Sequence, residues 1–363
     1  MPKKTNYNRL HQAHLARYQK SVGDIFAEAV REAARLGEIV DFDGSKPFSF
    51  DDYPIVKRRF DKLIAGMGSK LEAVIVSGVN SEWTLANNKN NELARMVFGD
   101  NAGKLTQAQY RRYFSNNDKA REAFLTRKVQ GLDLSERVWK YTSQFKEEIE
   151  LGLDVGIRNG LDAAAMAREL KQYLQHPDML FRRVRDEQGM LHLSKRAAAY
   201  HPGQGVYRSS FKNARRLTVT ETNMAYHSSD YERWQQLDFV VGIEIRLSGN
   251  HTCLGRDGKA HEFHDICDDL QGRYPKDFKF VGWHPHCRCQ ATAILKTKDE
   301  LMAENKALLD GKKPSSDSVN KVEDVPDNFK EWLTDNEERI ARAKSQPYFI
   351  RDNADYVAEV LEQ

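Results

Sequence analysis

The chain has 363 residues and a formal net charge of +3, with 40% hydrophobic and 30% charged residues. One hydrophobic core rarely serves more than about 250–300 residues, so this length predicts two or three domains. No run of about 18 apolar residues is present, and the basic start MPKKTNYNRLHQAH has no apolar core behind it, which argues against a membrane-spanning helix and a secretory signal. We therefore expect a protein made and used in a cytoplasm, where thiols stay reduced.

Residues 1–130 have the apolar spacing of a helical N-terminal region. The stretch RLHQAHLARYQKSVGDIFAEAVREAARLG repeats apolar residues at helical spacing and stops at Gly37. The turn-forming stretch DFDGSKPFSFDDYP predicts a break near 41–54. Helical patterns resume over 55–98, with expected interruptions at two glycines and at NNKNN, and a shorter helix is expected over about 106–128.

Residues 131–180 form a predicted helical arm. Ser135 is the expected N-cap, with the acidic Glu136 in the first turn. Apolar side chains then follow a helical period as far as Gly160, and one more helix ends before Pro177. Amphipathic helices of this kind usually serve as scaffolds or interaction surfaces rather than as catalytic elements.

The pattern changes in residues 181–296. FRRVRDEQGMLHLS predicts a hairpin about Asp186–Gly189, and SSFKNARRLTVTETNMAYHSSDYERWQQL predicts a long helix with small residues on one face. The alternating stretch FVVGIEIRLS at 239–248 is the clearest strand, and QATAIL at 290–295 predicts a second one. The segment between them is therefore a long excursion between two strands of one small sheet.

Residues 297–363 return to helix, with a polar linker, KKPSSDSVNKVEDVPDN, between two amphipathic segments. The predicted fold class is α+β. A mainly helical N-terminal region precedes a small α+β module with a His/Cys loop between two strands, and a helical C-terminal tail follows.

All four cysteines lie within 37 residues, and three of them fall in FHDICDDLQGRYPKDFKFVGWHPHCRC. Where thiols stay reduced, clustered cysteines indicate a metal more often than a disulfide. His264-x-x-Cys267 has the spacing of a zinc ligand pair, and Cys287-x-Cys289 is a second pair. His284, three residues before Cys287, is a competing ligand. We expect a structural Zn²⁺ held by four of these five side chains.

Two other interpretations of this window stay open at this point. The His–Cys loop could be a metal-free, hydrogen-bonded turn, and the upstream Cys253 has no assigned role. The window could also hold a catalytic metal and a general base, as in a metal-dependent nuclease. The side chains available for such a site are His251, His261, His264, His284, His286, Asp257, Asp265 and Asp268.

The order of these motifs resembles the phage head morphogenesis family, the Mu protein F-like minor capsid proteins. The match covers about residues 205–295, and its most specific element is His-Pro-x-Cys-Arg-Cys at 284–289. Members have Cys-x-x-Cys where this chain has His264-x-x-Cys267, and histidine is an acceptable zinc ligand. The other matching pieces are Arg216, Thr220-Glu221-Thr222, Ala225, His264-Asp-Ile-Cys267 and Gly272-Arg-Tyr274.

The resemblance implies a minor capsid protein of a tailed phage or prophage that acts in procapsid assembly near the portal and the packaged DNA. Its partners would be portal or capsid proteins. It would work in the cytoplasm of the bacterial host during assembly and then lie in the interior of the virion head. We expect neither enzymatic activity nor membrane contact. The alternative is a metal-dependent nuclease or toxin-like effector that uses the His/Cys cluster.

Two smaller hypotheses follow from the same residues. Glu221, on a helix face lined by small side chains, is expected to contact the His–Cys loop and hold it in place. Basic clusters at 57–59, 111–112, 181–185 and 212–216 predict a weak, sequence-independent contact with DNA phosphates.

Overall fold

Three long helices account for much of the computed structural model, namely α1 (Tyr7–Glu38), α2 (Pro54–Phe98) and α8 (Ser210–Gln236). Among the residues that the structure describes, no helix is both long enough and apolar enough to cross a bilayer. The described residues are 5–42, 44–177, 183–185, 188–193, 195–202, 206–248, 252–254, 259–315 and 317–362.

The internal contacts of the chain divide it into two units. Unit 1 comprises residues 1–15, 79–124 and 220–363, and unit 2 comprises residues 16–78 and 125–219. Each of the three long helices contributes one part to each unit. The segments predicted with limits at 130, 180 and 296 follow the order of the chain rather than these contacts, and they stay predictions.

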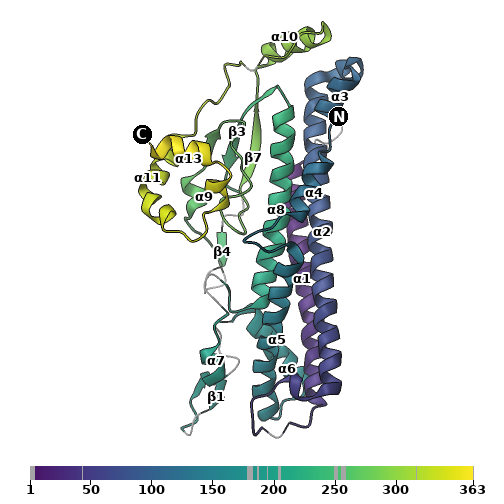
Figure 1. Cartoon of the computed structure of the whole chain (residues 1–363), viewed down its shortest axis with the longest axis vertical. Coiled ribbons are helices and arrows are strands. Elements are labelled where there is room, and N and C mark those ends of the chain that lie inside the picture. The colour runs from purple at the N-terminus through teal and green to yellow at the C-terminus, as the bar shows by residue number, and fades with distance from the viewer. Residues whose placement is uncertain are drawn as a thin grey trace. The chain divides into compact units, whose positions relative to one another are not determined.

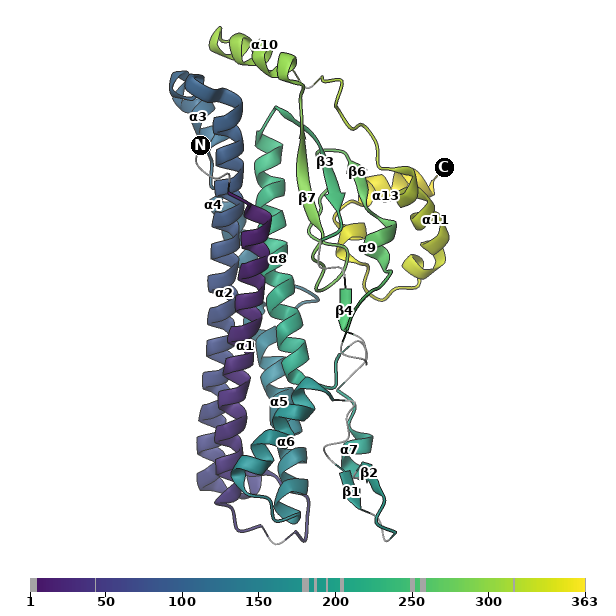
Figure 2. The same ribbon diagram turned by 180° about the vertical axis from the view of Figure 1, so that it is seen from behind.

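Unit 2 has a helical core. Helix α5 (Leu134–Arg158) lies against α6 (Ala163–Gln175), as Figure 2 shows. The ring of Phe26 packs edge-on against the rings of Phe145 and Phe211, at centroid distances of 5.5 and 5.4 Å. Edge-to-face aromatic pairs of this kind stabilise a core beyond the apolar area that they bury.

Two helix predictions are corrected by the structure. The N-cap of α5 is Asp133 rather than Ser135. The Asp133 carboxylate accepts a hydrogen bond from the Glu136 backbone N–H at 2.8 Å. The Glu136 carboxylate accepts one from the Asp133 N–H, also at 2.8 Å, which completes a capping box. Helix α2 also runs without a break through Gly66, Gly68 and the NNKNN stretch. Apolar residues at helical spacing are buried along its length, and this burial outweighs the roughly 1 kcal/mol that each glycine costs.

Unit 1 contains a three-stranded antiparallel sheet with the order β6–β3–β7. The central strand β3 (Val240–Arg246) pairs with β6 (Gly272–Tyr274) and β7 (Gln290–Leu295). Helices α9 (Ile266–Asp269) and α11 (Asp327–Ala341) lie beside this sheet, together with α13 (Ala354–Leu361) (Figure 1). The β3–β7 pairing confirms that the His–Cys window lies between two strands of one sheet.

The remaining elements are short. The antiparallel pair β1–β2 confirms the hairpin predicted in the 181–194 stretch, although residues 186 and 187 of its turn lie outside the described residues. The other short elements are η1 (Phe50–Asp52), η2 (Gly99–Lys104), α3 (Gln107–Tyr113), α4 (Asp118–Thr126), β1 (Arg183–Arg185), β2 (Leu191–Leu193), α7 (Lys195–Ala199), β4 (Thr252–Leu254), β5 (Ala260–Glu262), α10 (Lys298–Leu309) and α12 (Tyr348–Arg351).

An aromatic core fills unit 1. The rings of Tyr274, Phe278, Trp283 and Phe329 lie in pairs at centroid distances from 4.4 to 6.4 Å. Three cysteines of the His–Cys window belong to the same buried cluster. The α+β fold class is therefore confirmed, with a mainly helical N-terminal region, a small sheet with cysteine and histidine side chains near its strands, and C-terminal helices.

The predicted polar linker is held against the sheet. Between α10 and α11, the backbone N–H of Val322 donates to the carbonyl of Val241 at 3.1 Å, and the Asn320 amide donates to the carbonyl of Leu295 at 2.9 Å. Val325 is 3% exposed. Residues 310–326, called the 310–326 connection below, thus cover part of β3.

Candidate metal centre

Cys267 is placed by the first turn of α9. Asp265 is the N-cap of this helix, and its Oδ1 accepts a hydrogen bond from the Cys267 backbone N–H at 2.8 Å. The Asp268 carboxylate in turn accepts one from the Asp265 N–H at 2.8 Å. A helix of four residues is too short to be stable alone, so this reciprocal capping fixes it and directs Cys267 into the core of unit 1.

Cys287 and Cys289 come from a tight turn that leads into β7. The Cys287 backbone N–H donates to the carbonyl of His284 at 3.0 Å, which closes the turn. Gly282 has φ of +117°, and a Cβ built there would lie 3.2 Å from the Cβ of Cys287, so both conformation and space favour glycine. Because β7 begins at Gln290, the sheet fixes the position of Cys289.

The three thiols converge in one place and are called the thiol cluster below. The Sγ atoms of Cys267 and Cys287 are 3.8 Å apart, and the Sγ atoms of Cys267, Cys287 and Cys289 all lie within 4.8 Å of one another. A tetrahedral zinc ion with Zn–S bonds of roughly 2.3 Å places its sulfur ligands about 3.8 Å apart. All three thiols are free and at most 3% exposed. The thiol cluster could therefore bind a metal ion.

His284 stands next to the thiol cluster. Its Nε2 lies 3.1 Å from the Sγ of Cys267, and its Nδ1 lies 2.8 Å from the carbonyl oxygen of Pro285. A carbonyl can only accept, so Nδ1 carries the proton and Nε2 keeps the lone pair that a metal ligand needs. Asp265 Oδ2 is 3.3 Å from the same Nε2, and these two residues with Cys267 form a second group of potential ligands.

Ionisation within the thiol cluster is uneven. Hydrogen bonds with Cys267 and then Cys289 hold the pKa of Cys287 well below its usual range, whereas the hydrogen bond to Cys287 raises the pKa of Cys267. The hydrogen bond with Cys267 lowers the pKa of Cys289, but contact with Cys287 and burial outweigh it and raise that pKa. Loss of a proton is therefore favoured at Cys287 over the other two positions. A bound divalent ion would displace the remaining protons.

The structure separates His264 from the other expected ligands. Its side chain is 73% exposed, and its Nε2 lies 3.4 Å from a carboxylate oxygen of Asp269. The neighbouring Asp265, which the ligand spacing did not single out, faces His284 instead. The side chain of Cys253 lies outside the described residues, so its role is not defined by the structure.

The side chains considered for a nuclease site are spread over the module. Asp265 and His284 lie together, Asp268 caps α9, and His261 is exposed on β5. His251 and Asp257 lie outside the described residues.

Helix α8 contacts the turn at residues 284–289 directly. The hydroxyl of Thr220 accepts a hydrogen bond from the backbone N–H of His286 at 3.2 Å, and the two residues are 66 positions apart in the sequence. His286 has φ of +70°, so this bond supports a strained residue in the turn. Glu221, the residue expected to hold the loop, is 3% exposed. The neighbouring Thr220 contacts the turn, and a contact between Glu221 and the loop stays a prediction.

A buried histidine beside this turn could not be found from spacing. His227 on α8 is 2% exposed, and its ring stacks edge-on against Phe280 at 5.1 Å. Burial lowers the pKa of His227 to about 3, so the imidazole is neutral at physiological pH.

A second polar group in unit 1 also lacks a sequence signal. The buried carboxylate of Glu82 on α2 accepts from Nδ1 of His11 at 2.6 Å and from Nδ1 of His14 at 2.8 Å. Nε2 of His11 lies 3.0 Å from Oδ1 of Asn223 on α8. The spacing of His11 and His14 places both on one helix face, but nothing in the sequence indicates their partner 68 or more residues away.

Comparison with known proteins identifies no relative, since no protein-family model, no curated protein and no solved structure matches this chain. The functional argument therefore depends on the chemistry and arrangement of these residues.

Proposed function

We propose that this chain is a minor capsid protein of a tailed phage or prophage, acting in head morphogenesis near the portal and the packaged DNA. In this proposal it binds portal or capsid proteins in the host cytoplasm and is carried into the virion head. A structural Zn²⁺ at the thiol cluster holds its sheet module rigid, and the protein has no catalytic role.

The burial of the three cysteine side chains is the observation that supports a structural role for the metal. The thiol cluster belongs to the aromatic core of unit 1, and each of its side chains is at most 3% exposed. Structural zinc sites use four protein ligands and are closed, whereas catalytic sites keep one position for water or substrate. Three buried thiols with His284 beside them therefore support a structural site.

The arrangement of the motifs supports a single docking module. Pieces that are far apart in the sequence, the helix motif at 220–225 and the turn at 284–289, are joined by the Thr220–His286 hydrogen bond. The resemblance to head morphogenesis proteins is carried by these same pieces. Their contact is the reason for proposing that the module acts as one unit in assembly.

Co-purification tests the assembly role. The full-length chain would be co-expressed with the portal and major capsid proteins of the same phage or prophage. We expect a complex that persists in about 0.5 M NaCl, because apolar contacts are not screened by salt. The complex should be lost with Cys287→Ser and kept with His264→Ala, whose side chain is exposed. A zinc-loaded chain that binds neither protein contradicts the assembly role while leaving the metal site intact.

A metal-dependent nuclease is the second candidate, and one observation favours it. Asp265 and His284 are 26% and 34% exposed at the edge of the thiol cluster, which leaves a solvent-facing side for a metal-bound water. Incubation of supercoiled plasmid with the protein and Mg²⁺, Mn²⁺ or Zn²⁺ tests this. Nicking that disappears with His284→Ala would replace the structural role by a hydrolytic one.

Weak DNA contact is a separate part of the proposal. The clusters at 57–59 and 111–112 are largely exposed and the one at 212–216 is half-buried or buried, whereas the side chains of 181–185 lie outside the described residues. Binding through such residues should fall steeply with salt and be equal for unrelated DNA sequences. Affinity that is insensitive to salt would contradict a phosphate contact.

A further inference from the structure

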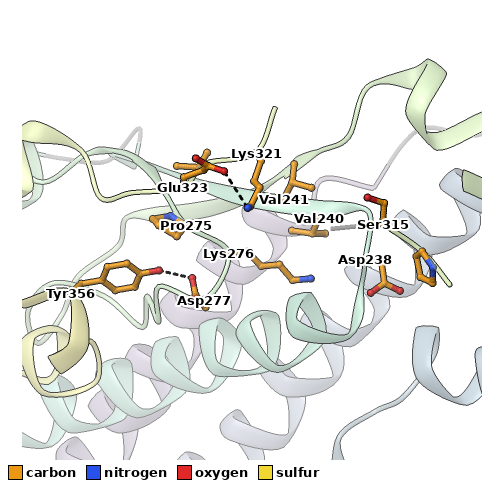
Figure 3. A pocket seen from close by; sticks show the side chains of 12 residues that line it. Asp238, Val240, Val241, Pro275, Lys276, Asp277, Ser315, Lys321, Glu323 and Tyr356 are labelled. Atoms are coloured by element: carbon orange, nitrogen blue, oxygen red, sulfur yellow. Dashed lines mark hydrogen bonds and ion pairs between the residues drawn. The ribbon is translucent and has the colours of Figure 1, made fainter. Parts of the chain in front are cut away.

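A cavity of about 370 Å³ lies beside the start of β3, away from the thiol cluster (Figure 3). Its walls come from four parts of unit 1: the start of β3, the turn after β6, the 310–326 connection and α13. Small-molecule sites have volumes of roughly 300–1,000 Å³, so this cavity suits a small ligand. The lining includes the apolar Val240, Val241 and Pro275, the carboxylates of Asp238 and Asp277, and Lys276.

The negative charges on the wall already have partners. Asp238 accepts from the Tyr113 hydroxyl at 2.8 Å and also pairs with Arg112.

The other two carboxylates are likewise paired. Asp277 accepts from the Tyr356 hydroxyl at 2.6 Å, and Glu323 pairs with Lys321 at 3.2 Å, as the dashed lines in Figure 3 show. No carboxylate on this wall therefore needs a cation from a ligand.

Lys276 differs from these groups. Its ammonium donates to the backbone carbonyl of Leu237 at 2.9 Å, and among the described residues no carboxylate oxygen lies within 4.0 Å of its Nζ. An ammonium has three N–H donors, so two of them have no partner in the described part of the chain. In Figure 3 this side chain lies below Val240, with its ammonium end directed towards Asp238.

The surroundings of Lys276 make its charge costly. Burial lowers the pKa of Lys276, and the positive charges of Arg112 and Lys296 act in the same direction, whereas Asp238 and Asp277 act against it. A partly desolvated cation with free donors is stabilised by an anion that enters the cavity.

We propose that this cavity binds a small monocarboxylate with a short apolar chain, whose oxygens accept hydrogen bonds from Lys276. The chain of the ligand packs against Val240, Val241 and Pro275. A phosphate dianion fits less well, because it would bring two negative charges towards three carboxylates with one unpaired ammonium to meet it.

Thermal unfolding of the full zinc-loaded chain tests the proposal, with sodium formate, acetate, propionate and butyrate as probes and sodium chloride and phosphate at matched ionic strength as references. We expect a saturable rise in Tm, about 2–4 °C for butyrate at ten times its Kd. Each added methylene should tighten binding by up to about fourfold until the cavity is filled.

Matched variants separate binding to the cavity from general salt effects. Lys276→Gln should abolish the saturable rise, and Lys321→Gln should keep it, because Lys321 is already paired with Glu323. Equal shifts in wild type and Lys276→Gln would overturn the site. A shift that depends on Lys276 but is as large for phosphate as for butyrate would overturn the assignment to a monocarboxylate.

A measurement on the wild type alone covers the case in which Lys276→Gln does not fold. Binding needs the ammonium form, so the affinity for butyrate should fall as pH rises through the lowered pKa of Lys276. An affinity that stays constant to pH 10.5, the ordinary pKa of lysine, would rule out Lys276 as the contact.

Discussion

Unit 1 and unit 2 each bury an acidic centre, and the two centres are stabilised differently. In unit 2 the fully buried Glu148 on α5 accepts from the backbone N–H of Ser210 at 2.9 Å, from its hydroxyl at 2.5 Å and from the Gln144 amide at 2.9 Å. In unit 1 the hydrogen bonds to the thiol cluster come mainly from its own thiols, one backbone N–H and His284.

The difference shows what each centre needs. Carboxylate oxygens are strong acceptors, and the backbone N–H and hydroxyl of Ser210 at the start of α8 donate to Glu148. Sulfur is a weak acceptor, and three thiolates in one place would repel one another. We therefore expect the thiol cluster to reach its full stability with a bound cation, whereas Glu148 accepts hydrogen bonds that the protein itself supplies.

The largest effect is expected at the thiol cluster. Cys287→Ser should abolish stoichiometric zinc and lower the free energy of unfolding of unit 1 by roughly 4 kcal/mol or more, because structural zinc contributes about 10 kcal/mol of binding free energy. Elemental analysis and guanidinium unfolding with and without a chelator measure both.

Two histidine variants serve as controls for this prediction. His264→Ala should keep its zinc, because the side chain is 73% exposed and paired with Asp269. His284→Ala should bind zinc less tightly, because its Nε2 lies 3.1 Å from Cys267. Zinc lost with His264→Ala and kept with His284→Ala would contradict this assignment of the fourth ligand.

Glu148→Ala tests the buried carboxylate of unit 2. It leaves the Ser210 N–H and hydroxyl without this acceptor, whereas the Gln144 amide keeps the carbonyl of Tyr207, and the loss should cost about 3 kcal/mol. Hydrogen exchange at the Ser210 amide should speed up while zinc stays bound. Glu147→Ala is the matched control, since this neighbouring carboxylate is exposed. Loss of zinc with Glu148→Ala would show that the two centres are coupled.

Gly242→Ala tests whether damage to the sheet reaches the thiol cluster. A Cβ at Gly242 would lie 2.6 Å from Cγ2 of Val322 and 3.3 Å from the carbonyl oxygen of Tyr274. Overpacking should cost about 1–3 kcal/mol and displace the 310–326 connection, with zinc retained. Val322→Ala should relieve about 1 kcal/mol of this in a double-mutant cycle, and strictly additive changes would contradict the contact.

Helical periodicity predicted much of this fold, because amphipathic stretches bury one face wherever they pack. The N-cap of α5 was also readable, since Asp133 with Glu136 forms a capping box and Ser135 does not. Composition was misleading for the 310–326 connection, because its polar residues gave no sign that Val322 and Val325 would pack against the sheet module.

The sequence likewise predicted only part of the candidate site. Spacing indicated that the cysteines converge, but both His264 and His284 satisfied it. Only the capped start of α9 shows that the chain turns His264 outward. The Lys276 cavity could not be predicted at all, because its walls come from segments that tertiary folding alone brings together.

Glu300 offers the smallest and sharpest contrast with Glu148, since it is an anion near the surface with backbone donors. Hydrogen bonds from the backbone N–H groups of Thr297 and Val319, at 2.8 and 3.0 Å, and from the Ser318 hydroxyl lower the pKa of Glu300 to about 2. Because the folded-state pKa lies below the ordinary value of 4.5, this contribution to stability is full above pH 4.5 and is lost as pH falls towards 2.

Glu300→Gln should remove that part of the pH dependence and speed exchange of the Val319 amide at pH 5, whereas Asp299→Asn, at an exposed acid of the same turn, should not. If wild type and Glu300→Gln gave the same stability difference between pH 5 and pH 3, the backbone donors would not hold Glu300 as an anion, and the contrast with Glu148 would rest on burial alone.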